Sequence, residues 1–516
     1  MGRLRAFAAG RFGKQSLDRN THERPQGAVG MIEVRLSGDR SILANADILV
    51  MPAFAEASGP QLADVGLLEK AGQGERFASA LRRDAVFQAR PSQLSALLVP
   101  AENGPAVLAA GLGPRETFSA NTLRDALMAA AIFLKGRGRC VVVLDGLGLD
   151  IASAMRAATE ACLLGGHGGQ ADESTIVDLL TIDAPGAERG FAIGKAVGKA
   201  ANWVRELVET PGNKLVPEDL AEVVATRARQ LGIGVDIWGE AELAKRGFGA
   251  TRAVGYGSVN KPLVLCLNPN RPKARLGLAG KGITFDSGGI NLKRNPQEIV
   301  WMKADMAAAA AVAGAIFAAV ELGFDPDVTA ILPLAENMPG SHALRPGDVV
   351  THPDGRRTEI TDTDSEGRLV LADAVAYLAR SGVGAIVDVG TLTDGGGVGP
   401  LLWGCWTTSN TLAEELIAAG ETAGEPGWRL PLRPEYERLI ESKVADIANA
   451  ALAVPDSGQL AATYLRTFAG KTPWVHIDNG STAYLDQGFA PWPVGATGSP
   501  TRALLQFLLS RAQVEK

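Results

Sequence analysis

Between Pro217 and Val389, short apolar runs alternate with segments of helical periodicity, and this alternation constrains the fold more than any other feature of the sequence. Strands that alternate with helices favour a parallel sheet with helices on both faces. The sequence therefore predicts a doubly wound, mostly parallel α/β sheet, with a hairpin that turns at Asp354-Gly355. The predicted strands lie at 235–238, 263–267, 276–280, 328–334 and 385–389, and the predicted helices at 217–230, 306–322 and 369–380.

The first part of the chain shows a similar alternation, which predicts a separate three-layer α/β domain. Its predicted strands lie at 42–51, 94–100, 106–111 and 140–145, and its predicted helix at 120–134. An apolar periodicity of about 3.6 residues then predicts one long helix from 188 to 208. We expect a disordered basic tail at 1–30, an N-terminal domain at 31–187, a linker helix at 188–209 and a C-terminal domain at 210–516.

The composition excludes several classes of protein. A net charge of −6 gives no basic footprint, so neither nucleic acid nor an anionic membrane is the expected partner. The four cysteines are widely spaced and form no Cys-x-x-Cys pair, which favours buried, reduced thiols in a cytoplasmic protein. The apolar run at 306–320 is shorter than a bilayer span and is predicted to be a core helix. The Arg-rich first thirty residues favour a tail over an organelle transit sequence or an upstream extension.

Charged residues end the apolar strand at 276–280. The sequence Lys281-Gly-Ile-Thr-Phe-Asp286 follows it, and a glycine pair stands shortly after. Burying either charge alone is costly, so each side chain needs a partner. An internal ion pair between Lys281 and Asp286 and a bound metal ion explain this segment equally well.

Two further acidic segments favour the metal ion. Asp305 precedes one predicted helix, and Asp364 and Glu366 precede another, so all three segments are expected at the same edge of the sheet. Favourable charges at helix N-termini explain one acid per helix. They do not explain Asp364 and Glu366 beside Asp362, because crowded carboxylates repel each other unless cations lie between them.

Carboxylates without histidine or cysteine form an oxygen-rich site, which suits Mg²⁺, Mn²⁺, Co²⁺ or Zn²⁺. The number of acids suits two ions that share ligands. The five histidines are expected to be solvated or bonded locally.

Long ordered motifs in the C-terminal part resemble the leucyl (cytosol) aminopeptidase family. They are Lys281-Gly-Ile-Thr-Phe-Asp286-Ser-Gly-Gly-Ile-Asn-Leu-Lys293, Met302-Lys-Ala-Asp305-Met and Thr363-Asp364-Ser-Glu366-Gly-Arg368-Leu. The resemblance extends from Glu188 to the C-terminus, and it implies an enzyme that removes the N-terminal residue from peptides.

The resemblance also implies two divalent ions per subunit, with Mn²⁺ or Zn²⁺ ahead of Mg²⁺ or Co²⁺. One ion would be held by Lys281, Asp286, Asp305 and Glu366, and the other by Asp286, Asp364 and Glu366. Lys281 would bind only as the neutral amine.

Two cationic residues receive roles through the same resemblance. Lys293 would polarise the substrate carbonyl, and Arg368 would hold a bicarbonate that acts as general base. The family also implies a homohexamer.

The expected pocket for the first substrate side chain contains Met302, Thr391 and Asp394. The family commonly has glycine at the position of Asp394, so this residue is predicted to shift preference away from leucine, toward basic or polar residues. A non-catalytic scaffold or DNA-binding regulator of the same family is the alternative, with only the basic tail in its favour. A nucleotide-binding N-terminal domain, suggested by Gly111-Leu-Gly-Pro-Arg115, rests on fold analogy alone.

Overall fold

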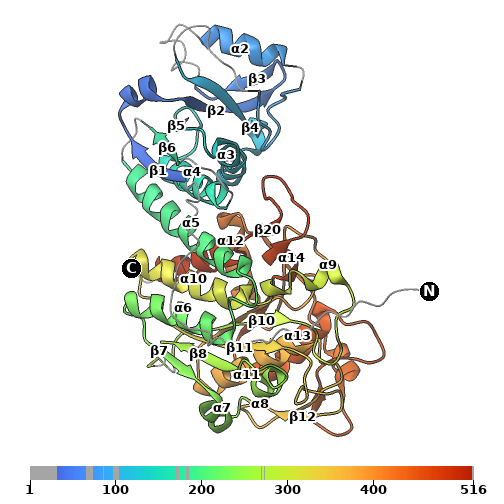
Figure 1. Cartoon of the computed structure of the whole chain (residues 1–516). Helices are drawn as coiled ribbons and strands as arrows, with labels where there is room; N and C mark the ends of the chain where they lie inside the picture. The colour runs from blue at the N-terminus through green and yellow to red at the C-terminus, as the bar shows by residue number, and fades with distance from the viewer. Residues whose placement is uncertain are drawn as a thin grey trace, which may run out of the picture.

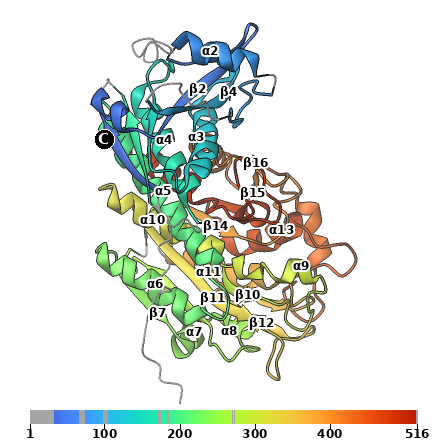
Figure 2. The same ribbon diagram turned by 45° about the horizontal axis from the view of Figure 1, so that its top comes forward.

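The computed structural model describes residues 32–64, 74–84, 86–96, 104–168, 174–181, 185–268, 270–271 and 273–513. The tail predicted at 1–30 lies outside these residues. Two α/β units lie one above the other in Figure 1, and helix α5 (Ala187–Glu209) runs from the smaller upper unit into the larger lower one. The view in Figure 2 shows the same division.

The smaller unit is built on a six-stranded sheet with the order β1-β6-β5-β2-β3, in which β4 also pairs with β2. All pairs are parallel except β2 with β3. Helices α3 and α4 pack on one face and α2 on the other, so the three predicted layers form. The elements are β1 (Ile32–Ser37), β2 (Ile48–Glu56), β3 (Gly59–Leu62), α2 (Gly74–Arg83), β4 (Ala106–Gly113), α3 (Ala120–Leu134), β5 (Arg139–Val143), α4 (Ile151–Gly166) and β6 (Thr175–Leu180).

The strand predicted at 42–51 is wrong in its first half. Residues 40–45 form a 3-10 helix, and the strand begins only at Ile48. The amide of Ser41 donates a hydrogen bond of 2.8 Å to the Asp39 carboxylate, which caps the 3-10 helix at its start. A local side-chain cap therefore outweighs the apolar pattern here.

The strand predicted at 94–100 falls partly outside the described residues, which stop at 96 and resume at 104. Within them, Leu94 makes a single isolated bridge. The glycine-rich segment after β4 turns into a short 3-10 helix before α3, and Gly113 lies there at φ +77°. This segment is a strand-to-helix turn, and its left-handed backbone explains the glycine.

Helix α5 confirms the long helix predicted at 188–208. It packs against α4 in the smaller unit and against α10 in the larger one. Its last residue, Glu209, accepts hydrogen bonds from Lys303 Nζ at the backbone oxygen (2.9 Å) and at Oε2 (2.8 Å). The end of the linker is thus fixed to the segment that leads into Asp305.

The larger unit is built on a nine-stranded sheet with the order β16-β15-β18-β14-β9-β11-β8-β7, in which β10 pairs with β11. The pairs among β18, β14, β9, β11 and β10 are all parallel, whereas β7, β8 and β15 add antiparallel edges. The strands are β7 (Val235–Trp238), β8 (Leu263–Leu267), β9 (Leu276–Gly280), β10 (Gly282–Asp286), β11 (Val328–Asn337), β14 (Ile386–Gly390), β15 (Trp403–Thr407), β16 (Gly427–Arg429) and β18 (Trp474–Asp478).

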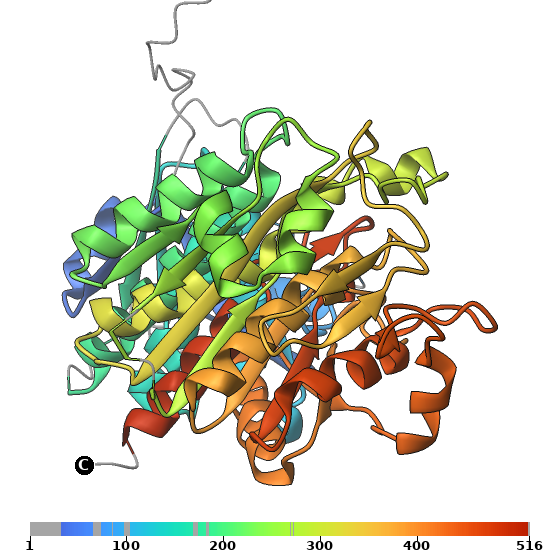
Figure 3. The ribbon, with the colours of Figure 1, turned by 90° about the horizontal axis from the view of Figure 1, so that it is seen from below.

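Helices cover both faces of this sheet (Figure 3). One core contains side chains of α6, α10, α12 and α15, and the other contains side chains of α8, α11 and α13. The predicted doubly wound, mostly parallel α/β fold is confirmed. The helices are α6 (Pro217–Gln230), α7 (Glu240–Arg246), α8 (Gly249–Gly255), α9 (Pro296–Ile299), α10 (Ala307–Glu321), α11 (Glu366–Ser381), α12 (Asn410–Ala423), α13 (Gly458–Ala469), α14 (Gly480–Ala483) and α15 (Thr501–Gln513).

Smaller elements complete the larger unit. The predicted hairpin forms β12 and β13, which β17 extends into a three-stranded sheet. These strands are β12 (Val349–Thr351), β13 (Arg357–Glu359) and β17 (Ile447–Ala448), and a second small sheet contains β19 (Tyr484–Leu485) and β20 (Gly495–Ala496).

Among the described residues, one segment, Met302–Glu321, is long and apolar enough to cross a membrane. The apolar run at 306–320, on which the sequence-based prediction rests, is shorter than a bilayer span. The segment joins a 3-10 turn to α10, and 89% of its apolar window is buried inside the protein. It is therefore the core helix that the sequence predicts.

Candidate metal centre

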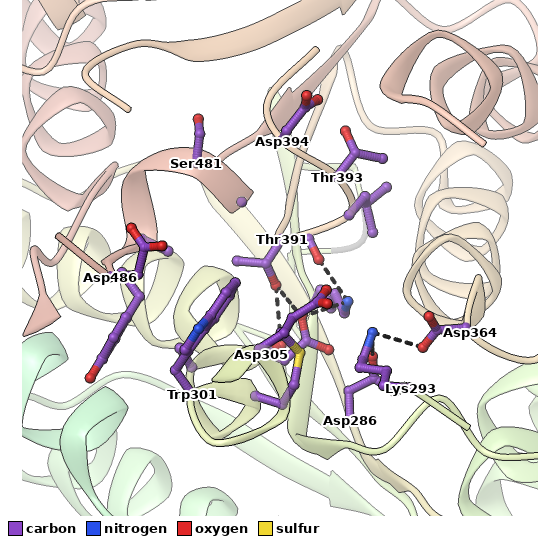
Figure 4. A pocket seen from close by; sticks show the side chains of 18 of the residues that line it. Asp286, Lys293, Trp301, Asp305, Asp364, Thr391, Thr393, Asp394, Ser481 and Asp486 are labelled. Carbon is purple, nitrogen blue, oxygen red and sulfur yellow. Dashed lines mark hydrogen bonds and ion pairs between the residues drawn. The ribbon is translucent and has the colours of Figure 1, made fainter. Parts of the chain in front are cut away.

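A cavity of about 660 Å³ opens at the carboxyl ends of the parallel strands. Asp286 ends β10, Asn337 ends β11, Thr391 follows β14 and Asp478 ends β18. These strands run in the same direction, so their last residues meet at one edge, where doubly wound sheets bind ligands. Figure 4 shows the side chains that line this cavity.

Lys281 lies between β9 and β10 and is buried beneath the cavity. Its Nζ lies 2.7 Å from Asp305 Oδ1 and 2.9 Å from Glu366 Oε1, and it donates a hydrogen bond of 2.8 Å to the backbone oxygen of Thr391. Thr391 Oγ1 donates to Asp305 Oδ1 at 2.6 Å. Three strand or helix ends are thereby joined around one amine.

Lys293 forms a second bridge between carboxylates. Its Nζ lies 2.8 Å from Asp286 Oδ2 and 2.7 Å from Asp364 Oδ1 (Figure 4). Asp286 Oδ1 also accepts hydrogen bonds from Gly288 N at 2.9 Å and Asn337 Nδ2 at 2.8 Å. The five residues predicted to bind metal and the predicted helper Lys293 therefore lie together at this edge.

Glycines allow the backbone segments to approach this closely. A Cβ on Gly367 would lie 2.6 Å from Lys281 Nζ, so any larger residue at the start of α11 would push the amine away. Gly288 has φ +86°, and a Cβ there would lie 2.7 Å from Asp364 Oδ1. Close approach and left-handed backbone both require glycine here.

The charges of the site change the pKa values of its members. Burial raises the pKa of Asp305 well above its usual value, and the neighbouring acids Glu366 and Asp286 raise it further against the opposing effect of Lys281. Burial, Asp286 and Glu366 raise the pKa of Asp364 to about 7. Four carboxylates crowded around two amines therefore hold more negative charge than the amines balance.

Both lysine amines remain cationic in this arrangement. Burial lowers the pKa of Lys281, but Asp305, Glu366 and Asp286 outweigh it and raise the pKa above its usual range. The same holds for the pKa of Lys293, for which Asp286, Glu366 and Asp364 outweigh burial. Each ammonium group lies between two carboxylates and reduces the repulsion between them.

The donor set fits a divalent metal ion. Asp286, Asp305 and Glu366 each offer a carboxylate oxygen, and these atoms lie within 4.8 Å of one another. Asp305 Oδ2 is buried and has no hydrogen-bond partner among the described residues. A buried acceptor without a donor is costly, and a bound cation would satisfy it. Oxygen ligands of this kind suit hard or borderline divalent ions.

Arg368 points away from this cluster of acids. Its Nη1 donates hydrogen bonds of 2.9 Å to Asn449 O and to Asp456 Oδ1, and its Nη2 binds Asp456 Oδ2. The carboxylate of Asp456 thus occupies the fork that the resemblance assigns to a bicarbonate. Arg368 in this conformation does not fit an external anion held by both terminal nitrogens.

The residues predicted to form the pocket for the substrate side chain, Met302, Thr391 and Asp394, all line the cavity. Asp394 is exposed, and its Oδ1 accepts hydrogen bonds of 3.1 Å from the amides of Gly396 and Gly397. This turn fixes the carboxylate on the cavity wall.

Sequence reasoning missed several residues that support or line the cavity. Trp301 and Tyr484 line it and stack with ring centroids 6.1 Å apart, so they form an aromatic wall. Asp478 accepts hydrogen bonds from the amides of Leu392 at 3.3 Å and Thr393 at 3.0 Å, which holds the loop after β14. Two sequence signals could have identified such residues: Asp478 stands at the end of an apolar strand, and Trp301 directly precedes Met302. Glu298 and Asp486 also line the cavity.

Two of the histidines and all four cysteines follow the sequence prediction, whereas His22 lies outside the described residues. His352 and His476 are buried and bind Asp373 and Asp388, at 2.7 Å and 2.5 Å. All four cysteines are buried and free.

The model of the cytosol aminopeptidase family, catalytic domain, matches residues 202–505, which is more than half of the chain. The chain belongs to the cytosol aminopeptidase family. A probable cytosol aminopeptidase of Roseiflexus castenholzii is 39% identical over 430 residues, which cover 78% of this chain and 86% of that protein. A probable cytosol aminopeptidase of Solibacter usitatus is 35% identical over 481 residues, which cover 90% of this chain and 96% of that protein.

A solved structure gives the same result for this cytosol aminopeptidase fold. The bottromycin maturation enzyme BotP in complex with Mn is 34% identical in sequence and has a TM-score of 0.78. The match covers 90% of this chain and 100% of the BotP chain. The chain is a metal-dependent aminopeptidase, and its substrates are peptides.

Proposed function

We propose that the chain removes the N-terminal amino acid from peptides by hydrolysis with two divalent ions. The observation that carries this proposal is the crowding of four carboxylates around two lysine amines at the carboxyl edge of the sheet. These acids repel one another, and one of their buried oxygens has no donor among the described residues. Membership of the aminopeptidase family supplies the reaction.

The ligand sets follow the family motif. One ion would be held by Lys281, Asp286, Asp305 and Glu366, and the other by Asp286, Asp364 and Glu366 with the backbone oxygen of Asp364. Bound ions of this kind make a water nucleophilic near neutral pH and polarise the peptide carbonyl. Lys281 would bind as the neutral amine, so metal binding would release its proton. Mn²⁺ and Zn²⁺ are the first candidates, with Mg²⁺ and Co²⁺ as alternatives.

Lys293 would act on the substrate carbonyl. Its Nζ lines the cavity and lies 2.8 Å from Asp286 Oδ2 and 2.7 Å from Asp364 Oδ1, beside the acids of both proposed ions. A cation fixed beside the reacting carbonyl stabilises the negative charge that develops on the oxygen. Arg368 has no step in this proposal, because Asp456 already occupies its terminal nitrogens.

Asp394 would influence which N-terminal residue is preferred. Its carboxylate is exposed on the cavity wall, which Glu298 and Asp486 also line, so three acids that are not assigned to the metals face the substrate. Negative charge in a partly enclosed site favours a cationic ligand. We therefore propose a shift from leucine toward basic or polar side chains.

The deciding experiment removes and restores the metal. The purified protein is chelated and then supplied with Mn²⁺, Zn²⁺, Co²⁺ or Mg²⁺, and hydrolysis of leucyl, arginyl and alanyl amides is measured. Activity should disappear on chelation, return with at least one ion, and be absent from Asp286→Ala. Asp325→Ala is the matched control, since Asp325 pairs with Arg271 outside the cavity and is exposed. Activity that persists through both chelation and Asp286→Ala would refute the proposal.

Three further predictions remain proposals. From the pattern of strands and helices we infer an N-terminal domain, a linker helix and a catalytic domain that begins near 210, and from the cysteines a cytoplasmic location. The resemblance implies a homohexamer, which a measurement of the mass in solution tests.

A further inference from the structure

The anion bound to Arg368 is a carboxylate of the same chain, that of Asp456. Asp456 binds both terminal nitrogens of the guanidinium through its two carboxylate oxygens, in the fork-to-fork geometry that makes arginine–carboxylate pairs strong and specific. Ser365 Oγ donates a third hydrogen bond to Asp456 Oδ2 at 3.3 Å. The aspartate is therefore held by two residues of the metal-binding segment 362–368.

The residues that hold Asp456 are close in sequence to two proposed metal ligands. Ser365 stands between Asp364 and Glu366 in sequence, and Arg368 follows Glu366 in the first turn of α11. Gly458, two residues after Asp456, packs against Thr393 on the cavity wall, because a Cβ at Gly458 would lie 3.1 Å from Thr393 Oγ1. The segment 451–458 thus joins the start of α11 to the loop after β14.

Access to the guanidinium is restricted. The side chain of Arg368 is 1% exposed, whereas that of Asp456 is 31% exposed. An external anion would have to displace Asp456 to reach Nη1 and Nη2. The remaining nitrogen, Nε, is buried with no hydrogen-bond partner among the described residues, and a single N–H does not provide the two-point contact that the fork gives a carboxylate.

We propose that Asp456 is the resident anion of Arg368 and takes the place of the bicarbonate that the family resemblance implies. Asp456 is a positioning residue: it neutralises Arg368 and ties the segment 451–458 to the turn that carries Asp364 and Glu366. The effect on hydrolysis rests on the proposed function, whereas the effect on anion binding does not. The wild-type protein does not bind bicarbonate at Arg368, and its activity is independent of bicarbonate.

The first test measures binding without activity. The metal-loaded protein is titrated with ¹³C-labelled bicarbonate, and binding is followed from the carbon resonance and by calorimetry. The wild type and the control Asp325→Ala should show no saturable binding, whereas Asp456→Ala and Asp456→Asn should bind bicarbonate. Arg368→Lys in the Asp456→Ala background should weaken this binding, because lysine lacks the fork. Saturable binding to the wild type that Arg368→Lys removes would overturn the proposal.

The second test measures chemical rescue. In buffer freed of carbonate, kcat/KM of Asp456→Ala should fall by about tenfold, the lower end of the range for residues that orient metal ligands, because Asp456 acts on the proposed ligands only through Ser365 and Arg368. Bicarbonate or formate should restore most of the loss through kcat, and neither should change the wild type. If Asp456 had only a structural role, the added anion would not restore kcat of Asp456→Ala.

The outcomes separate this inference from the proposed function. If no metal ion gives the wild type activity, the proposed function fails, and the bicarbonate titration still decides the anion of Arg368. If the wild type is active but loses activity when carbonate is removed, Asp456 does not replace bicarbonate. If Asp456→Ala keeps full activity with and without anion, Asp456 has no positioning role.

Discussion

The two α/β units share an architecture but differ in what stands at the ends of their parallel strands. In the smaller unit, Asp145 follows β5 and accepts a hydrogen bond of 3.1 Å from Thr181, which follows β6. In the larger unit, the corresponding edge gathers four carboxylates and two lysine amines. In the smaller unit this single carboxylate lies near one arginine, with Asp145 Oδ2 3.8 Å from Arg40 Nη2, whereas four carboxylates of the larger unit surround only two amines. The comparison teaches that the fold provides the edge, whereas the excess of negative charge at one edge is what the proposed metal ions would balance.

The largest expected effect comes from removing one of the two acids, Asp286 and Glu366, that both proposed ions share. Glu366→Ala should lower kcat/KM by about a thousandfold or more, because bound ions supply several kcal/mol of transition-state stabilisation. Asp145→Ala at the edge of the smaller unit should leave kcat/KM unchanged. Equal losses in the two variants would remove the distinction between the two edges.

A somewhat smaller effect is expected at Lys293. Lys293→Met keeps much of the side-chain volume but removes the donor, and kcat should fall by roughly 10²–10³ if the ammonium stabilises developing charge. The metal content, measured by elemental analysis, should stay near that of the wild type. A lysine of the smaller unit, Lys135, donates to backbone oxygens of His167 and Gly168, and Lys135→Met should not change kcat. A fall in metal content that accounts for the loss would contradict the role of Lys293.

A third effect is expected at Asn337, whose side chain orients the proposed ligand Asp286. Its Nδ2 donates to Asp286 Oδ1 and to the backbone oxygen of Thr363, so Asn337→Ala releases one ligand from its orientation. Metal affinity should fall by about 10- to 100-fold. Calorimetric titration of the metal-free protein measures it. The control is Asn410→Ala, since Asn410 is exposed, lies outside the cavity and accepts a hydrogen bond from Arg429. Unchanged affinity would mean that Asp286 needs no such support.

The smallest effect is expected at Asp394. Asp394→Asn removes the charge but keeps an acceptor for the amides of Gly396 and Gly397. The ratio of kcat/KM for arginyl over leucyl amides should fall by about two- to fivefold, because an exposed ion pair contributes about 0.2–1 kcal/mol. A ratio that stays constant in both Asp394→Asn and Asp394→Gly would contradict the proposed preference.

Local patterns were enough to predict much of the larger unit. Helix α6 and strands β7, β8 and β9 have the predicted limits, because proline starts the helix and apolar runs form buried strands. Strand β10 was not predicted, because the charged residues Lys281 and Asp286 and the glycines around them indicated the end of a strand and not a second one. The predicted ligands also lie together, because parallel strands bring their carboxyl ends to one edge.

Contacts between distant segments could not be predicted in this way. Asp456 reaches Arg368 from a loop 88 residues further along the chain, and neither its spacing nor its neighbours indicate that partner. The aromatic pair Trp301 and Tyr484 likewise depends on the path of two loops. In the smaller unit, the first half of the strand predicted at 42–51 is a 3-10 helix that Asp39 caps.

The contact between Glu209 and Lys303 has a consequence for how the two units communicate. The last residue of α5 holds the residue two positions before Asp305, and the other end of α5 packs on the smaller unit. If α5 moves as a rigid body, these two attachments would act as a lever, and a tilt of the smaller unit would displace the proposed ligand Asp305. By thermodynamic reciprocity, metal binding would then restrict that tilt, and a molecule that binds the smaller unit and tilts it would change the affinity for metal.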